Sequence, residues 1–404
     1  MPAHGTRRLV AALYAYAFLD EFVLLYPLYA LLFTDAGLGP VEISALFVLW
    51  SATAIVLEVP SGALADAVSR RALLVAAPLI GAAGYGLWVL VPGFWAFALG
   101  FVLWGVRGAL VSGSFEALAY EELAARGAAG AYARVLGRAH TAGVAAVVLA
   151  TALAAPAFGA GGYRLVGAAS VAAGLLAAGA ALLLPEDRTH PGPGDDPDAD
   201  SAGYLATLRA GLREARDAPA VRRAVLLVPA VTALWGSLEE YTSLHVRGTG
   251  VPTGQVPWWE LVLWCGVGIG GLLAGRAAGL PAPALAAVVA AGGLLLTAGA
   301  AGGRTAGIVA VAAGFGALQL AGVVVGAWLQ DAVTGPARAT VTSVASLAAE
   351  LVAVVVYLAY GALAGPLGHG TTFALLGLAY LPVAVWVSRG LTQADLVADA
   401  AEAG

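Results

Sequence analysis

The chain has 404 residues, of which 60% are hydrophobic and only 11% charged, and its formal net charge is −5. A soluble domain carries about 25% charged residues, so this composition argues against a water-soluble enzyme and indicates a membrane protein. The single cysteine excludes an internal disulfide bond.

A membrane-spanning helix needs about 20 predominantly apolar residues, and twelve stretches of the chain meet that requirement. The predicted fold is therefore an all-α membrane protein with twelve transmembrane helices in two pseudo-symmetric six-helix bundles. In chain order the predicted spans are Leu9–Phe33, Val41–Leu64, Ala72–Val91, Phe94–Leu118, Ala139–Phe158, Leu165–Leu184, Ala224–Val246, Val256–Gly275, Ala284–Ala301, Gly307–Leu329, Ser343–Leu363 and Thr372–Val387.

The arginines predict the orientation, because cytoplasmic segments of membrane proteins carry an excess of basic residues. With a cytoplasmic N-terminus, sixteen of the 20 basic residues fall in inner segments, and the outer loops hold only Arg164, Arg247 and Arg304. This distribution predicts a multi-pass protein of the cell membrane with both termini in the cytoplasm.

One segment interrupts the apolar pattern. Residues Glu186–Gly203 are acidic and rich in Pro and Gly, a composition that is typical of a disordered linker. After it, Leu205, Leu208 and Leu212 share one face of a possible amphipathic helix on the inner membrane surface, and a solvated helix is nearly as plausible. The predicted domains are an N-terminal bundle at 1–184, a linker at 185–222 and a C-terminal bundle at 223–404.

The two halves resemble each other. Leu19–Phe22, in the first span, reads Leu-Asp-Glu-Phe, and Leu238–Tyr241, in the seventh, reads Leu-Glu-Glu-Tyr. Further short matches follow in the same order, which favours a parallel duplication. Two six-helix halves with a site between them is a recurring plan of secondary transporters.

Four stretches of the sequence carry a resemblance to a known family. The sequence GALADAVSRR, at Gly62–Arg71, resembles the signature of the loop between helices two and three in the major facilitator superfamily. The stretches LEVPSG at Leu57–Gly62, SGSFEALAYEEL at Ser112–Leu123 and ARATVTSVASL at Ala337–Leu347 are similar to a prokaryotic, drug-efflux-like branch of it. Ser69 replaces the usual glycine of the loop signature. The resemblance implies a secondary transporter.

The loop motif also implies a gate. The resemblance places Gly62, Asp66, Arg70 and Arg71 in a cytoplasmic gating motif, in which a charged lock forms in one state and breaks in another. The alternative is that Arg70 and Arg71 only enforce topology. Three further residues are predicted to be structural charge partners near helix ends: Glu58, Glu116 and Arg338.

Charged residues inside the predicted spans are the strongest functional signal. They are Asp20, Glu21, Arg107, Glu239, Glu240 and Glu350. Each costs about 2.5–3.5 kcal/mol at a helix centre, so these side chains must pair, face a wet cavity or carry a proton. The acids outnumber the one arginine, which predicts proton coupling or a cationic substrate.

Asp20 and Glu21 cannot share one face of a helix, since consecutive residues point about 100° apart. We expect Glu21 in the cavity beside Tyr14 and Phe18, because aromatic walls with one acid suit an amphipathic or cationic ligand. Asp20 then contacts a neighbouring helix, and Arg107 pairs with Glu21 or Asp20. By pseudo-symmetry Glu240 corresponds to Glu21. A purely structural hydrogen bond is the alternative for each acid.

The sequence thus predicts a proton-coupled secondary transporter that works by alternating access. It is expected to export a small amphipathic or cationic molecule by proton antiport, with no cofactor, no metal and no nucleic acid, as a monomer in the lipid bilayer. Uptake of a metabolite by proton symport is the nearest alternative. A membrane sensor or a membrane-embedded enzyme is another, although no catalytic motif is present, and the glycines of GVGIGG at Gly266–Gly271 favour helix packing over nucleotide binding.

Overall fold

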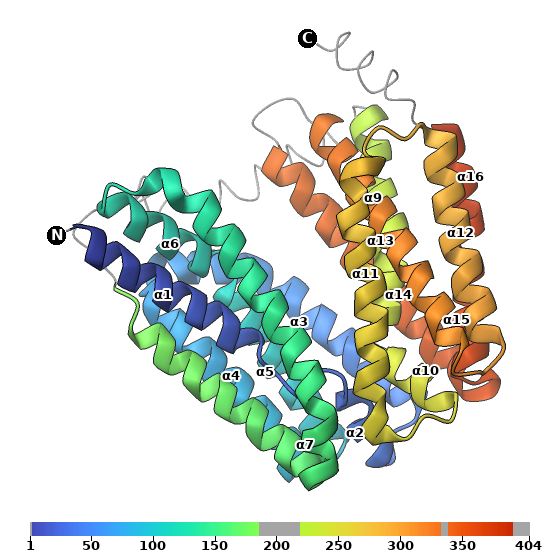
Figure 1. The fold of residues 1–404 in the computed structure, drawn as a ribbon, viewed down its shortest axis with the longest axis horizontal. Coiled ribbons are helices and arrows are strands. Elements are labelled where there is room, and N and C mark those ends of the chain that lie inside the picture. The colour runs from blue at the N-terminus through green and yellow to red at the C-terminus, as the bar shows by residue number, and fades with distance from the viewer. Residues whose placement is uncertain (1, 186–218, 333–337, 391–404) are drawn as a thin grey trace. The chain divides into compact units, whose positions relative to one another are not determined.

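A computed structural model describes residues 2–185, 219–332 and 338–390, and it divides the chain into two compact units, Met1–Asp200 and Ser201–Gly404. The described residues form helices and turns, with no strand among them (Figure 1). Most of the predicted linker, including the amphipathic segment at Leu205–Leu212, lies outside the described residues.

In the first unit, α7 packs along α1 and α4, and α5 packs between α3 and α4. The helix α7 contains a kink at Gly161 and Gly162, where the backbone leaves helical geometry and Gly162 takes a positive φ of 59° that favours glycine. The elements are α1 (Pro2–Glu21), α2 (Tyr29–Asp35), α3 (Pro40–Ala67), α4 (Arg70–Leu90), α5 (Phe94–Val111), α6 (Ser114–Ala125), η1 (Ala129–Ala131) and α7 (Tyr132–Leu182).

In the second unit, α13 packs against α9, α11 and α12, while α14 packs against α9 and α16 against α12. The elements are α9 (Pro219–Glu239), α10 (Thr242–Gly248), η2 (Thr253–Gln255), α11 (Val256–Ala277), α12 (Ala282–Ala301), α13 (Gly307–Ala332), α14 (Arg338–Leu367), α15 (His369–Leu378) and α16 (Tyr380–Gly390).

The first predicted span is broken directly after its two acids. The helix α1 ends at Glu21, and α2 begins at Tyr29 after a run of turns. Pro27 lies in this break, and a proline disfavours helical geometry at the residue before it. The Ser170 hydroxyl of α7 accepts a hydrogen bond of 3.1 Å from the Leu25 amide, so one backbone donor that the break frees from the helix is satisfied by a side chain.

The seventh predicted span is broken at the equivalent place. The helix α9 ends at Glu239, and α10 begins at Thr242. There is no proline in this break, and the Thr242 hydroxyl donates to the Glu239 carbonyl at 2.7 Å. Both units therefore end a helix at the acid pair that the sequence repeat aligns.

Within the described residues, nine helices are long and apolar enough to cross a membrane. This number is lower than the twelve predicted spans, for two structural reasons. The first and seventh spans are each split by a break, and the fifth and sixth run together across the kink in α7 as one stretch, Ala129–Leu182.

Glycines bring α11 and α13 into close contact. A Cβ atom at Gly266 would collide with the backbone of Ala312, and one at Gly270 would collide with the backbone of Gly316. Gly268, which points the other way, faces open space. Two glycines of the GVGIGG stretch, Gly266 and Gly270, therefore serve helix packing, which is the role that the sequence favoured.

Candidate functional site

An open cavity of about 820 Å³ lies in the first unit, and several of its lining residues, including Glu116, Gly137 and His140, are exposed. It is bounded by α1, α6 and α7, with Val111 from the end of α5. Its ionisable or polar lining residues are Tyr16, Asp20, Glu21, Glu116, Tyr132 and His140. A volume of this size is ample for a small organic molecule.

Asp20 and Arg107 form a buried ion pair at the end of α1. The Arg107 Nη2 atom lies 2.7 Å from Asp20 Oδ2, and it also donates to the Asp20 carbonyl at 2.9 Å. Asp20 is 8% exposed and Arg107 is 7% exposed. Arg107 therefore pairs with Asp20, one of the two partners expected, and it places a cation at the C-terminus of α1, where the helix dipole favours it.

Glu21 lines the same cavity without such a partner. The Tyr26 hydroxyl, from the break after α1, lies 3.4 Å from Glu21 Oε2. Gly143 of α7 faces the Glu21 side chain, and a Cβ atom there would lie 3.3 Å from Glu21 Cγ. No described residue forms an ion pair with Glu21. Of the two consecutive acids, Asp20 is therefore the one that Arg107 neutralises, and Glu21 is the one that it does not.

The cavity wall differs from the one expected. Tyr14 and Phe18 do not line it, and Phe18 instead stacks on Phe22 at 5.5 Å. The α1 residues that line it are Tyr16, Ala17, Asp20 and Glu21, which form two adjacent stripes with spacing i, i+4. The cavity is wide enough to take in both stripes, so Asp20 and Glu21 both line it although they point in different directions.

Glu116 and His140 complete the ionisable lining. Glu116 was expected to pair with a loop arginine, but it lies in the cavity wall on α6. His140 belongs to the part of the wall that α7 forms. No described residue forms an ion pair with Glu116, so the cavity holds two carboxyl groups without an arginine partner.

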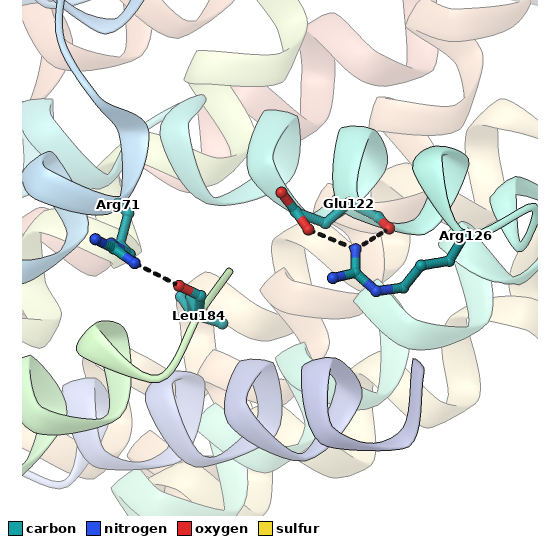
Figure 2. A network of polar contacts seen from close by, with 4 residues as sticks. All are labelled: Arg71, Glu122, Arg126 and Leu184. Carbon is teal, nitrogen blue, oxygen red and sulfur yellow. Dashed lines mark hydrogen bonds and ion pairs between the residues drawn. The ribbon is translucent and has the colours of Figure 1, made fainter. Parts of the chain in front are cut away.

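The two arginines at the start of α4 contact other residues of the first unit. Arg70 forms an ion pair with Glu121 of α6. The Arg71 Nη1 atom donates to the Leu184 carbonyl at 3.4 Å, just after the end of α7 (Figure 2). Figure 2 also shows Arg126, which donates to the carbonyl and the carboxylate of Glu122 at the end of α6. Of the other predicted motif and charge-partner residues, the side chains of Glu58, Gly62, Asp66 and Arg338 lie outside the described part of the structure.

In the second unit the acids gather at the break between α9 and α10. Glu239, Thr242 and Glu260 line a small void of about 10 Å³, and the Thr242 hydroxyl lies 2.9 Å from Glu260 Oε2. Glu240 is half-buried at the same break, and Glu350 is half-buried in α14. Among the described residues, no group of His, Cys, Asp and Glu side chains is arranged to hold a metal ion.

Sequence reasoning missed Glu260. It lies in α11 within the predicted eighth span and is 5% exposed. An acid inside a predicted span was the available signal, although Glu260 lies near the start of that span. The cavity roles of Tyr16 and His140 were also missed, because neither lies in a recognised motif.

Comparisons with known proteins support a transporter fold. The crystal structure of the nucleoside transporter NupG is similar with a TM-score of 0.71 at 14% identity, over 97% of this chain and 98% of that chain. A crystal structure of a bacterial homologue of the human lysosomal transporter Spinster, inward-facing and occupied, has a TM-score of 0.70 at 15% identity, over 99% and 97%. A D-xylose–proton symporter has a TM-score of 0.70 at 15% identity, over 98% and 99%.

These sequence identities are too low to assign a substrate or a direction of transport to this chain, so the similarities bear on the fold alone. A search of curated protein sequences finds no match. The family model of the Major Facilitator Superfamily, by contrast, matches residues 10–348. That match extends across both units, and the chain belongs to the Major Facilitator Superfamily.

Proposed function

We propose that this transporter exports a small amphipathic or cationic molecule by proton antiport. The observation that carries the proposal is the 820 Å³ cavity, in which Arg107 neutralises Asp20 while Glu21 and Glu116 have no ion-pair partner among the described residues. A bound cation or a proton can supply the missing positive charge. The same carboxyl groups therefore attract a cationic substrate and compete for it with protons.

The physical basis for proton coupling is desolvation. A carboxyl group taken out of water is more stable in its neutral form unless a cation lies close to it. This argument applies to Glu21, which is half-buried, whereas Glu116 is exposed. An arriving cation at Glu21 favours release of its proton. Binding of the substrate and binding of the proton then exclude each other, which is the exchange that antiport requires.

The apolar lining suits the organic part of such a molecule. Phe115, Leu136, Val144 and Val147 line the cavity beside the acids. Aromatic and aliphatic walls with a few polar groups are typical of small-molecule sites. The rings of Tyr16 and Phe115, which stack at 5.6 Å, belong to this lining.

We further infer the membrane arrangement from the arginine pattern. The proposal is twelve spans in two bundles at 1–184 and 223–404, joined by a cytoplasmic linker, in a monomer of the cell membrane with both termini in the cytoplasm. In this arrangement Gly62, Asp66, Arg70 and Arg71 belong to a cytoplasmic gate. The acids Glu239, Glu240 and Glu350 of the second unit contribute further protonation sites, and the drug-efflux-like branch is the proposed placement within the family.

Proteoliposomes with an imposed pH gradient test the function. Purified full-length protein is reconstituted, and uptake of ethidium and of tetraphenylphosphonium is followed against gradients of both signs. We expect accumulation in the compartment that supplies protons to the exchange, and loss of accumulation when an ionophore collapses the gradient. Accumulation that survives the ionophore contradicts coupling, and accumulation in the opposite direction supports symport.

A further inference from the structure

The second unit contains a buried carboxyl group that the cavity does not use. Glu260 of α11 faces the break between α9 and α10 and is 5% exposed. The void beside it measures about 10 Å³, and apart from Glu239 and Thr242 its other lining residues have largely apolar side chains, including Leu263, Val267 and Phe315. A void of that size holds about one water molecule at most, so this is not a substrate site.

The hydrogen-bond geometry at the break indicates which form of Glu260 is present. The Thr242 hydroxyl lies 2.7 Å from the Glu239 carbonyl and 2.9 Å from Glu260 Oε2, both good distances for an O–H···O bond. A hydroxyl carries one proton and donates one such bond. If Thr242 donates to the carbonyl, the second short contact requires a proton on Glu260.

A protonated Glu260 completes the chain of bonds. Glu260 Oε2–H then donates to the Thr242 hydroxyl, which donates to the Glu239 carbonyl. That carbonyl is at the end of α9, where the helix leaves acceptors without intrahelical donors. An ionised Glu260 would instead compete with the Glu239 carbonyl for the single proton of Thr242.

The surroundings of Glu260 also disfavour its charged form. Its Oε1 atom is buried without a hydrogen-bond partner, and no described residue forms an ion pair with it. The charged groups that act on it are Glu239 and Glu240, both acids. From α13, the helix that packs along α11, it meets the apolar ring of Phe315. A buried carboxylate with acids as its charged neighbours and one oxygen unsatisfied is costly.

We propose that Glu260 is a proton-binding site of the second unit and that Thr242 is its positioning residue. In the arrangement seen here Glu260 holds the proton. A change at the α9–α10 break that withdraws Thr242 or admits water releases it: the O–H bond breaks, the proton passes to water, and the electron pair stays on the carboxylate. The part that this proton plays in transport rests on the proposed function, whereas its presence does not.

Infrared spectroscopy tests the proton directly. The absorption of protonated carboxyl C=O groups is recorded at neutral pH for purified full-length protein and for Glu260→Gln, Thr242→Val and Thr242→Ser. We expect loss of one carboxyl band in Glu260→Gln, a shift of that band in Thr242→Val, and an unchanged band in Thr242→Ser, which keeps the hydroxyl. Glu42→Gln, an exposed acid at the start of α3, is the control. A carboxyl region identical in wild type and Glu260→Gln overturns the proposal.

A second measurement separates this site from the proposed function. In proteoliposomes, ethidium exchange at equal pH needs no net proton movement, whereas accumulation driven by a pH gradient does. We expect Glu260→Gln to keep exchange and to lose gradient-driven accumulation. Loss of both, in a variant that still folds, contradicts a role in coupling. If wild type shows no ethidium transport, the antiport proposal fails for this cation, and the infrared result alone decides whether Glu260 holds a proton.

Discussion

Arg107 contacts Asp20 at two points, through its carboxylate at 2.7 Å and through its carbonyl at 2.9 Å. One side chain therefore neutralises a buried acid and also caps the helix that ends one residue later. Arg107 forms its ion pair with Asp20, and no described residue forms one with Glu21, so a proton or a cation can bind at Glu21. This division of roles between two consecutive acids is the basis of the account.

The ion pair predicts a large loss of stability in Arg107→Leu. Removal of one partner leaves Asp20 buried and uncompensated, which typically costs about 3–5 kcal/mol. We expect a marked drop in the melting temperature of the purified protein. The double variant Arg107→Leu with Asp20→Asn removes both charges and should recover much of the loss. A double variant as unstable as the sum of both single variants contradicts a direct pairing.

The close packing of α11 on α13 predicts a sharp difference between two glycines of one stretch. Gly270→Leu places a side chain against the backbone of Gly316, whereas Gly268→Leu enters open space. Overpacking costs about 1–3 kcal/mol or more. We expect a lower melting temperature and poorer monodispersity in detergent for Gly270→Leu, and values near wild type for Gly268→Leu. Equal behaviour of the two variants contradicts the observed packing.

The cavity predicts that added bulk blocks transport without unfolding the protein. Gly137 of α7 lines the cavity, and a Cβ atom there meets nothing within 4 Å. Gly179, on the same helix, is equally open but lies outside the cavity. Gly137→Trp should reduce ethidium transport strongly at an unchanged melting temperature, and Gly179→Trp should transport normally. Normal transport by Gly137→Trp excludes this cavity as the substrate path.

The Arg70–Glu121 pair is partly exposed, with side chains 25% and 45% accessible. An exposed pair contributes about 0–1 kcal/mol, so Arg70→Ala should barely change the melting temperature. If the pair belongs to a gate, the same variant should alter the transport rate. The exchange Arg70→Glu with Glu121→Arg should restore that rate. Unchanged transport in Arg70→Ala favours a role in topology alone.

The sequence predicted an all-helical membrane protein and singled out the acids inside its spans because both inferences depend on simple physics. Long apolar stretches require a membrane, and carboxyl groups at Asp20 and Glu21 inside such a stretch demand compensation. The repeat between the halves also marked the place where α1 and α9 both end. These inferences need only the order of residues along one helix.

Details that depend on neighbouring helices were not predictable in this way. The orientation of α1 against α7 decides that Tyr16 lines the cavity and Tyr14 does not. The contact of Arg70 with Glu121 depends on where α4 meets α6, so the sequence could not show which acid of α6 Arg70 contacts. The inference about Glu260 depends on its contact with Thr242, which is 18 residues away in the sequence.

The most direct test of the account is gradient-driven ethidium transport by Glu21→Gln in inverted membrane vesicles, compared with wild type and the exposed control Glu42→Gln. The account predicts that wild type and Glu42→Gln accumulate the cation when the pH gradient is applied. Glu21→Gln, at matched expression and melting temperature, should lose that accumulation. Full gradient-driven accumulation by Glu21→Gln would contradict the assignment of Glu21 as the carboxyl group that exchanges a proton for the substrate.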